Sequence, residues 1–224
     1  MLVSILFVIT SASAAPEGFE KASALIIERA DRIASSPLAT VLDKTGCAPN
    51  GDKQEYFSLA PYWWPNSDSE DGVPYERRDG KVNPEANTGR FDRQSYFQMR
   101  DAIVYSTLAW RIDGERRYAE TAARWAKAWF IDDDTRMRPR FQFAQFVPGK
   151  NEGRPEGIIR GQSLLDVHAA LDVLKDSGAW GKQEHRAWGA WLSEYTDWLR
   201  DSDMGQRESR AFNNHGSWYD VILD

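Results

Sequence analysis

Apolar residues recur every three or four positions along most of the chain, which is the spacing of one face of an α-helix. The clearest run is Tyr118, Ala122, Trp125 and Trp129. The same spacing predicts five helices, with apolar faces in residues 22–33, 96–110, 118–129, 164–174 and 188–198. Asp-Gly at 113–114 and Ser-Gly at 177–178 are typical helix ends. Because the turns between helices are short, we predict an all-α fold of antiparallel helix pairs.

Two long segments, residues 48–88 and 136–161, interrupt the helical spacing. The first includes PYWWPNSDSEDGVPYERRDGKVNPE, whose prolines and Asp-Gly pairs preclude a long helix. In the second, residues 137–143 alternate like a strand, but Pro139 favours a loop or a sheet edge. Long irregular segments in a compact domain are commonly functional, so we expect both to be functional loops on a helical scaffold.

Both loops carry candidate ligand-binding side chains. Tyr62, Trp63 and Trp64 offer flat surfaces on which a sugar could stack, and Arg77 and Arg78 could meet anionic groups. The second loop adds Arg136, Arg138, Arg140, Lys150, Arg154 and Arg160. The whole chain has a net charge of -6, which argues against nucleic acid as a partner. Basic residues grouped in loops still allow an anionic ligand.

The composition is that of one soluble domain of 224 residues, 42% of them hydrophobic. Ten Trp, eight Tyr and ten Phe exceed what packing requires. They indicate either ligand-binding surfaces or a Trp-rich core, and the composition does not choose between them.

Cys47 is the single cysteine, which excludes an internal disulfide and a metal site built from cysteines.

The N-terminal residues predict export. An apolar run over residues 2–9 leads to Ala-Ser-Ala at 12–14, an A-x-A cleavage signal, and the run is too short to span a bilayer. We therefore predict a signal peptide at residues 1–14 and one domain at 15–224, in the periplasm of a bacterium or secreted. We expect no membrane association after cleavage.

The stretch FNNHGSWYDV, residues 212–221, concentrates amides, a histidine and aromatic residues. Asn followed by Asn-His could cap a helix, but a cap uses only one of the two amides. We therefore favour a site around His215. His168 falls on an apolar helix face and is expected either in the core or behind a site residue that it supports, whereas His185 is expected to be solvated. No metal-binding motif accompanies the histidines, so we predict no metal.

Three motifs together, YWWP with RRDGKVNPE, AQFVPGKNEGRPEGII and NNHGSWYD, resemble the alginate lyase family and its glucuronan-cleaving relatives. The resemblance covers the chain from about Tyr56 onward. It implies an α/α toroid that cleaves a uronic-acid polysaccharide such as alginate or glucuronan by β-elimination, without a cofactor. The partner would then be an anionic polysaccharide.

The resemblance also implies roles for individual residues. Asn214 and His215 would share the charge of the uronate carboxylate while the C5 proton is removed, and His215 could also be the base. Tyr219, one helical turn after His215, is a candidate catalytic residue or a packing residue. The predicted substrate-binding residues are Tyr62, Trp63, Trp64, Arg77, Arg78, Gln145, Arg154, Asn213 and Trp218.

The chain departs from the family pattern in one respect. In the family, a catalytic tyrosine and an arginine lie downstream of the Asn-His motif, and no matching positions follow it here. We therefore expect an incomplete toroid, the N-terminal part of a longer enzyme, and leave the activity of this chain open. Two alternatives remain, a non-catalytic polyuronate-binding protein and an α/α-toroid glycoside hydrolase. The sequence does not choose between alginate and glucuronan or between endo and exo cleavage.

Overall fold

The computed structural model describes residues 18–223, so the predicted signal peptide at 1–14 lies outside the described residues. The described part is mostly helical, and all five predicted helices are confirmed. Two shorter helices follow them. The α-helices are α1 (Phe19–Ala34), α2 (Arg93–Asp113), α3 (Arg116–Phe130), α4 (Gln162–Leu174), α5 (Lys182–Asp201), α6 (Asp203–Glu208) and α7 (Asn214–Leu223).

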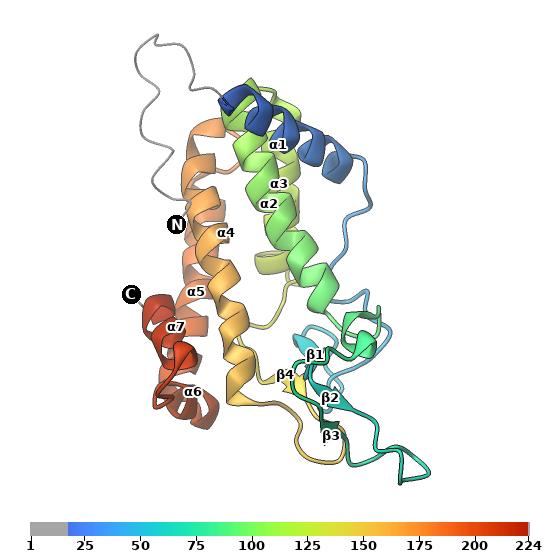
Figure 1. Cartoon of the computed structure of the whole chain (residues 1–224). Helices are drawn as coiled ribbons and strands as arrows, with labels where there is room; N and C mark the ends of the chain where they lie inside the picture. Colours follow the sequence, from blue (N-terminus) through green and yellow to red (C-terminus); the bar gives the residue numbers. More distant parts are fainter. Residues whose placement is uncertain (1–17, 224) are drawn as a thin grey trace.

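Helix α2 is the centre of the fold, because α1, α3 and α4 all pack against it (Figure 1). The α2–α3 pair turns at Gly114, whose φ of 77° is the left-handed conformation that glycine adopts easily. The predicted apolar face of α3 is buried against α2, including Tyr118, Trp125 and Trp129. This is the antiparallel pair that the helical spacing and the Asp-Gly turn predicted.

Most of the tryptophans of the helices belong to the core. Trp188 and Trp191 stack with ring centroids 5.6 Å apart, and Trp191 and Tyr195 continue the stack at 5.9 Å. Indole N–H groups also hold loops onto helices, since Trp191 donates to the carbonyl of Met137 at 2.8 Å. The Trp-rich core therefore accounts for these residues. Trp63, Trp64 and Trp218 are only half-buried.

The two long loops contain four short strands that the sequence did not predict. They are β1 (Phe57–Leu59), β2 (Trp63–Trp64), β3 (Glu76–Arg77) and β4 (Phe143–Phe146). Strand β1 pairs in parallel with β4, and β2 pairs antiparallel with β3. The β1–β4 pair joins the two loops into one lobe with its own small core around Phe57, Phe91 and Phe143.

A buried ion pair fixes this lobe to the start of α2. Asp92 Oδ2 accepts a hydrogen bond from the backbone N–H of Phe57 at 2.8 Å and lies 3.0 Å from Lys44 Nζ. Lys44 also donates to the carbonyl oxygens of Val41 and Lys53. Both charged side chains are fully buried, so strand β1 and the first turn of α2 are held together by fully desolvated polar contacts.

Helices α2 and α4 both begin at the end of the molecule where the strands lie, and α6 and α7 lie at the same end (Figure 1). A 3₁₀ segment, η3 (Pro155–Gly161), leads directly into α4 and packs against α6, α7 and β4. Its Gly157 allows close contact with β4, because a Cβ there would lie 2.4 Å from the Cβ of Ala144. The loops, η3 and α7 are thereby brought together.

One further expectation is corrected by the fold. His168 is exposed, so its expected place in the core is wrong; it lies at the edge of the α4 face and accepts a hydrogen bond from Trp188 Nε1 at 3.2 Å. None of the helices within residues 18–223 combines the length and apolar character that crossing a membrane requires.

Candidate active site

The motif at residues 212–221 forms the turn before α7 and the helix itself. Asn213 Oδ1 accepts a hydrogen bond from the backbone N–H of His215 at 2.9 Å, which makes it the helix cap. Gly216 allows the helix to sit close to the preceding turn, since a Cβ there would lie 2.1 Å from the carbonyl oxygen of Ala211. Capping accounts for Asn213, and its role in substrate binding stays a prediction.

The neighbouring amide is in a different situation. Asn214 is exposed, and its side chain forms no hydrogen bond with any of the described residues. Its carbonyl and amino groups are therefore available to a ligand without the loss of an internal contact. Of the two adjacent amides, one builds the helix end and the other is left for binding.

His215 is held by a buried glutamate from the preceding helix. Its Nδ1 lies 2.7 Å from Oε1 of Glu208, the last residue of α6, and the Glu208 side chain is only 3% exposed. Burial raises the pKa of Glu208, while its contact with His215 acts in the opposite direction. Nδ1 of His215 is hydrogen-bonded to Glu208 whether the shared proton lies on the ring or on the carboxyl group. Nε2 is therefore the ring nitrogen that remains for a ligand.

Segment η3 and the second loop add further polar groups beside this His-Glu pair. Arg154 Nη2 lies 2.6 Å from Oε1 of Glu156, and Gln145 Nε2 donates to the carbonyl of Glu156 at 3.0 Å. The hydrogen bond from Arg154 and, more weakly, the charges of Arg154 and His215 favour ionised Glu156, and its pKa is lowered despite burial. Glu156 therefore contacts the predicted residues Gln145 and Arg154, and its carboxylate also responds to the charge of His215.

Gln145 has a strained backbone. Its φ of 55° is left-handed, and within residues 18–223 it is the single non-glycine residue with a positive φ. The conformation is held at both ends of the residue, because the backbone N–H donates to Ser58 Oγ at 3.0 Å while the side chain binds Glu156. Such strain is concentrated at functional sites, where the surrounding contacts maintain it.

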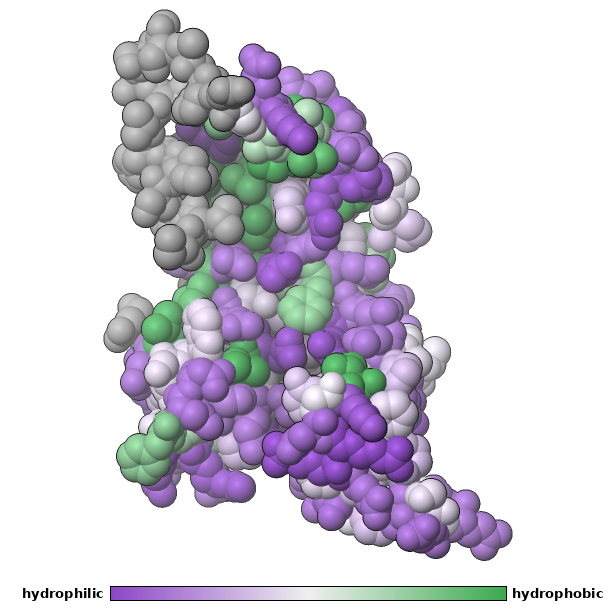
Figure 2. All heavy atoms as spheres, in the orientation of Figure 1, coloured by the Kyte–Doolittle hydropathy of each residue, from purple (hydrophilic) through white to green (hydrophobic). Residues whose placement is uncertain are grey.

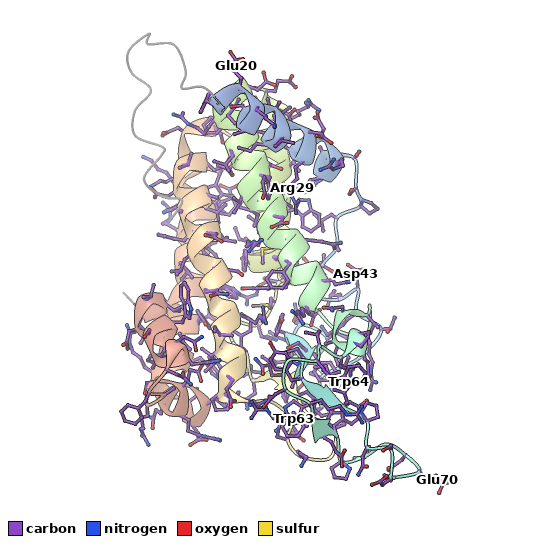
Figure 3. All side chains as sticks on the ribbon, in the orientation of Figure 1. Glu20, Arg29, Asp43, Trp63, Trp64 and Glu70 are labelled. Atoms are coloured by element: carbon purple, nitrogen blue, oxygen red, sulfur yellow. The ribbon has the colours of Figure 1, made fainter. Side chains whose placement is uncertain are left out.

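Trp63 faces the same group of residues. Lys150 Nζ lies 5.2 Å from its ring centroid, and Arg154 Cζ lies 5.8 Å away. Figure 3 shows Trp63 on the short strands near the beginning of α4. On the face shown in Figure 2, strongly hydrophilic side chains gather between that end of α4 and the strands. An aromatic ring flanked by two cations suits an acidic sugar, which can stack on the ring while its carboxylate meets the charges.

Other predicted binding residues lie elsewhere on the lobe. Successive strand residues point to opposite faces, so Trp64 is turned away from Trp63; it donates to the carbonyl of Lys81 at 2.9 Å and is covered by Arg78 at 5.6 Å. Arg77 is exposed and paired with Asp79 at 2.6 Å. Tyr62 is 41% exposed. The structure thus brings together Trp63, Gln145 and Arg154, but not Trp64, Arg77 and Arg78.

Tyr219 is packed rather than presented. It is 6% exposed, belongs to the core cluster, and donates from its hydroxyl to the carbonyl of Leu199 at 3.0 Å. Burial raises its pKa, so the hydroxyl holds its proton more firmly and is less available as a base. This geometry favours the packing alternative. Trp218, next to it, is half-buried.

Two cavities among the described residues lie away from the motif. One of about 580 Å³ lies between α1 and α3 beside Asp31 and Arg117, and one of about 460 Å³ is lined by Arg138, Arg140 and Trp198. Both are bordered by ion pairs, Arg117–Asp31 in the first and Arg138–Asp52 in the second. Residues 18–223 also hold no group of three His, Cys, Asp or Glu side chains that could bind a metal ion.

The sequence reasoning missed Glu208 and Glu156. A glutamate in a short amphipathic helix has no local signature, and the burial of Glu208 follows from the tight α5–α6 turn. The available signal was spacing: Glu208 precedes the Asn-Asn-His run across one turn, which places it within reach of His215.

The geometry can be set beside known proteins. The family model described as alginate lyase matches residues 40–223. The structure is similar to the crystal structure of an alginate lyase from Bacteroides ovatus, with a TM-score of 0.89 and 34% sequence identity. The match covers 93% of this chain and 55% of that chain, so the chain spans about half the length of that lyase. The comparison with curated proteins finds no match.

Proposed function

The chain belongs to the alginate lyase family, and from this membership we propose that it acts on a uronic-acid polysaccharide such as alginate or glucuronan by β-elimination. The observation that carries the proposal is the His215–Glu208 pair beside the exposed amide of Asn214. Glu208 orients the imidazole, and the free amide and Nε2 can then act on one carboxylate. Trp63 and Arg154 supply a stacking surface and a positive charge for the sugar next to it.

The proposed chemistry is an elimination that balances within the substrate. A base removes the C5 proton, the electron pair of that bond forms the C4–C5 double bond, and the C4–O4 bond breaks with its electrons on the leaving oxygen, which takes up a proton. The difficulty is the C5 proton, because negative charge develops next to a carboxylate. Donors at Asn214 and His215 lower this barrier by sharing that charge.

His215 can serve in a second way. When Nε2 carries no proton it can accept one from C5, so the imidazole is our candidate base among the described residues. Tyr219 is not, because its hydroxyl is buried against Leu199. We also propose that the helix pairs α2–α3 and α4–α5 form part of an α/α toroid, in keeping with the family.

Ultraviolet absorbance of the product tests the proposal. Only an elimination leaves a double bond conjugated with the uronate carboxylate, so alginate and glucuronan should each be incubated with the protein and followed spectroscopically. A glycoside hydrolase would release saturated sugars, and a binding protein would release none. Saturated products, or tight binding without any product, would overturn the lyase proposal.

Export is a separate proposal. We propose that the protein is exported, supported by the apolar run and the Ala-Ser-Ala signal in residues 1–14. N-terminal sequencing of the mature protein tests it: a start at Ala15 is expected, and a retained Met1 would contradict it.

A further inference from the structure

Two arginines outside the group around His215 occupy equivalent places at the ends of neighbouring helices. Arg93 is the first residue of α2, and Arg160 lies in η3, directly before α4. Helices α2 and α4 pack against each other and begin at the same end of the molecule (Figure 1). The positive ends of two helix dipoles therefore point toward the region that already holds both guanidinium groups.

Phe97 contacts Arg160 and lies one helical turn after Arg93. Arg160 Cζ lies 5.3 Å from the centroid of the Phe97 ring, and Phe97 follows Arg93 by four residues on the same face of α2. The pKa of Arg93 is lowered, first by burial and second by the positive charge of Arg160. Tyr62, the exposed aromatic residue of the first loop, acts on the pKa of Arg93 in the opposite direction and raises it slightly.

Neither arginine has an acidic partner within residues 18–223. Arg93 Nη1 is buried without a hydrogen-bond partner, and no ion pair involves Arg93 or Arg160. The contrast is Arg100, which lies 5.5 Å from the same Phe97 ring but is paired with Asp101 at 2.6 Å. The acid that precedes Arg93, Asp92, is occupied by Lys44. Two like charges held together without an anion are unfavourable, which indicates that an anion completes the arrangement.

We propose that Arg93 and Arg160 bind the carboxylate of a sugar residue of the substrate, at a position separate from the sugar that reacts at His215. The proposal rests on the proposed function. Segment η3 links the two positions, since Glu156 near His215 and Arg160 are four residues apart in it. Guanidinium groups bind carboxylates in a planar, two-point geometry, and Phe97 and Tyr62 supply apolar surface for the sugar ring. The polymer would then be recognised by its repeated carboxylates.

Binding measurements with two probes test this site. The acidic probe is a tetramer of glucuronate, and the neutral probe is the same tetramer with every carboxylate reduced to hydroxymethyl. Calorimetry is carried out in a His215→Ala background so that no turnover occurs. Arg93→Gln and Arg160→Gln should each weaken the acidic probe about tenfold or more and change the neutral probe less than about twofold. Arg100→Gln is the matched control and should leave both affinities unchanged.

Thermal melting of the free protein gives a second readout. Because Arg93 is an unpaired, partly buried charge, Arg93→Gln should leave the melting temperature unchanged or raise it by about 2 °C. A structural arginine would lower it. Any of three results would overturn the site: the acidic probe does not bind, the two probes lose affinity equally, or neither variant loses affinity for the acidic probe. If Arg160→Gln still performs the elimination and binds the acidic probe with unchanged affinity, only this inference is overturned. If the protein binds the acidic probe through its carboxylates but forms no product, only the lyase proposal is overturned.

Discussion

The Nδ1 atom of His215 lies 2.7 Å from the Oε1 atom of Glu208, and the two residues stand on separate helices, α7 and α6. Glu208→Gln keeps the shape of the side chain but removes its charge. We expect turnover to fall at least about tenfold with little change in KM, because the ring loses the partner that orients it. His215→Ala should cost about a hundredfold or more.

Steady-state kinetics on a soluble polyuronate, with melting temperatures measured in parallel, checks this role. Glu208→Asp should recover part of the lost turnover, and Glu194→Gln, an exposed change on α5, should have no effect. If Glu208→Gln lowers the melting temperature and leaves turnover unchanged, Glu208 is a structural residue only.

The two adjacent tryptophans should differ in their effect on binding. Trp63 is flanked by Lys150 and Arg154, while Trp64 packs against Arg78 and donates to Lys81. Trp63→Ala should weaken oligouronate binding by about 1–3 kcal/mol, the usual worth of an aromatic stacking surface. Trp64→Ala, its matched control, should change binding less. Calorimetry that finds equal losses would show that the loop acts as a whole and not through one face.

Tyr219→Phe separates packing from catalysis. The substitution removes the hydroxyl that donates to the Leu199 carbonyl, so we expect a loss of about 1 kcal/mol in the free energy of unfolding. Turnover should be unchanged. Denaturant unfolding and initial rates give the two quantities, and a large loss of turnover at unchanged stability would restore Tyr219 as the base.

The buried pair of Lys44 and Asp92 should make stability depend on pH. Burial raises the pKa of Asp92 to about 7, above its ordinary value of 3.8, so between pH 4 and 7 the folded state binds more protons than the unfolded state. Its contribution to stability is therefore present at low pH and is lost as pH rises through this window. Burial lowers the pKa of Lys44, and this contribution has the opposite sign, because it adds stability as pH rises.

Melting temperatures from pH 4 to 7 test this contribution. The double variant Lys44→Met with Asp92→Asn keeps an acceptor for the Phe57 N–H and removes both charges. Its melting temperature should decline less with pH than that of the parent. Above pH 7, where the Asp92 carboxyl of the folded parent is ionised, Asp92→Asn alone should be strongly destabilising, by about 3–5 kcal/mol, since it leaves Lys44 charged and unpaired in the core. Parallel pH curves for the parent and the double variant would contradict the assignment.

The helices were predictable because their apolar faces repeat locally. Tyr118, Trp125 and Trp129 are buried together by the geometry of one helix, without reference to distant residues. The short strands were not predictable in the same way. Trp63 and Trp64 form a strand only because Glu76 and Arg77 lie opposite, and that pairing depends on the path of a proline-containing loop.

The candidate site also combines residues that a local sequence pattern identifies with residues that only the folded structure reveals. Asn214 and His215 could be identified from a short motif, whereas the contact of Glu208 with His215 depends on the angle between α6 and α7, which the short spacing between the two residues suggests but does not determine. The unpaired arginines illustrate the limit further. Arg93 and Arg100 lie on the same helix and look alike in the sequence. Only the surrounding structure shows that Arg100 has a carboxylate partner, whereas Arg93 has none among residues 18–223.

The pairing of β1 with β4 also has a consequence for the order of folding. Glu55 and Arg140, which form an ion pair beside these strands, are 85 residues apart in the chain, and the α2–α3 pair lies between them. Contacts this distant require the closure of a long loop, which is slow compared with the formation of a helical pair. We therefore expect the helices to form first and the lobe that carries Trp63 and Gln145 to dock onto them last. In amide hydrogen exchange, α2 and α3 should then be protected early in refolding, and β1 and β4 late.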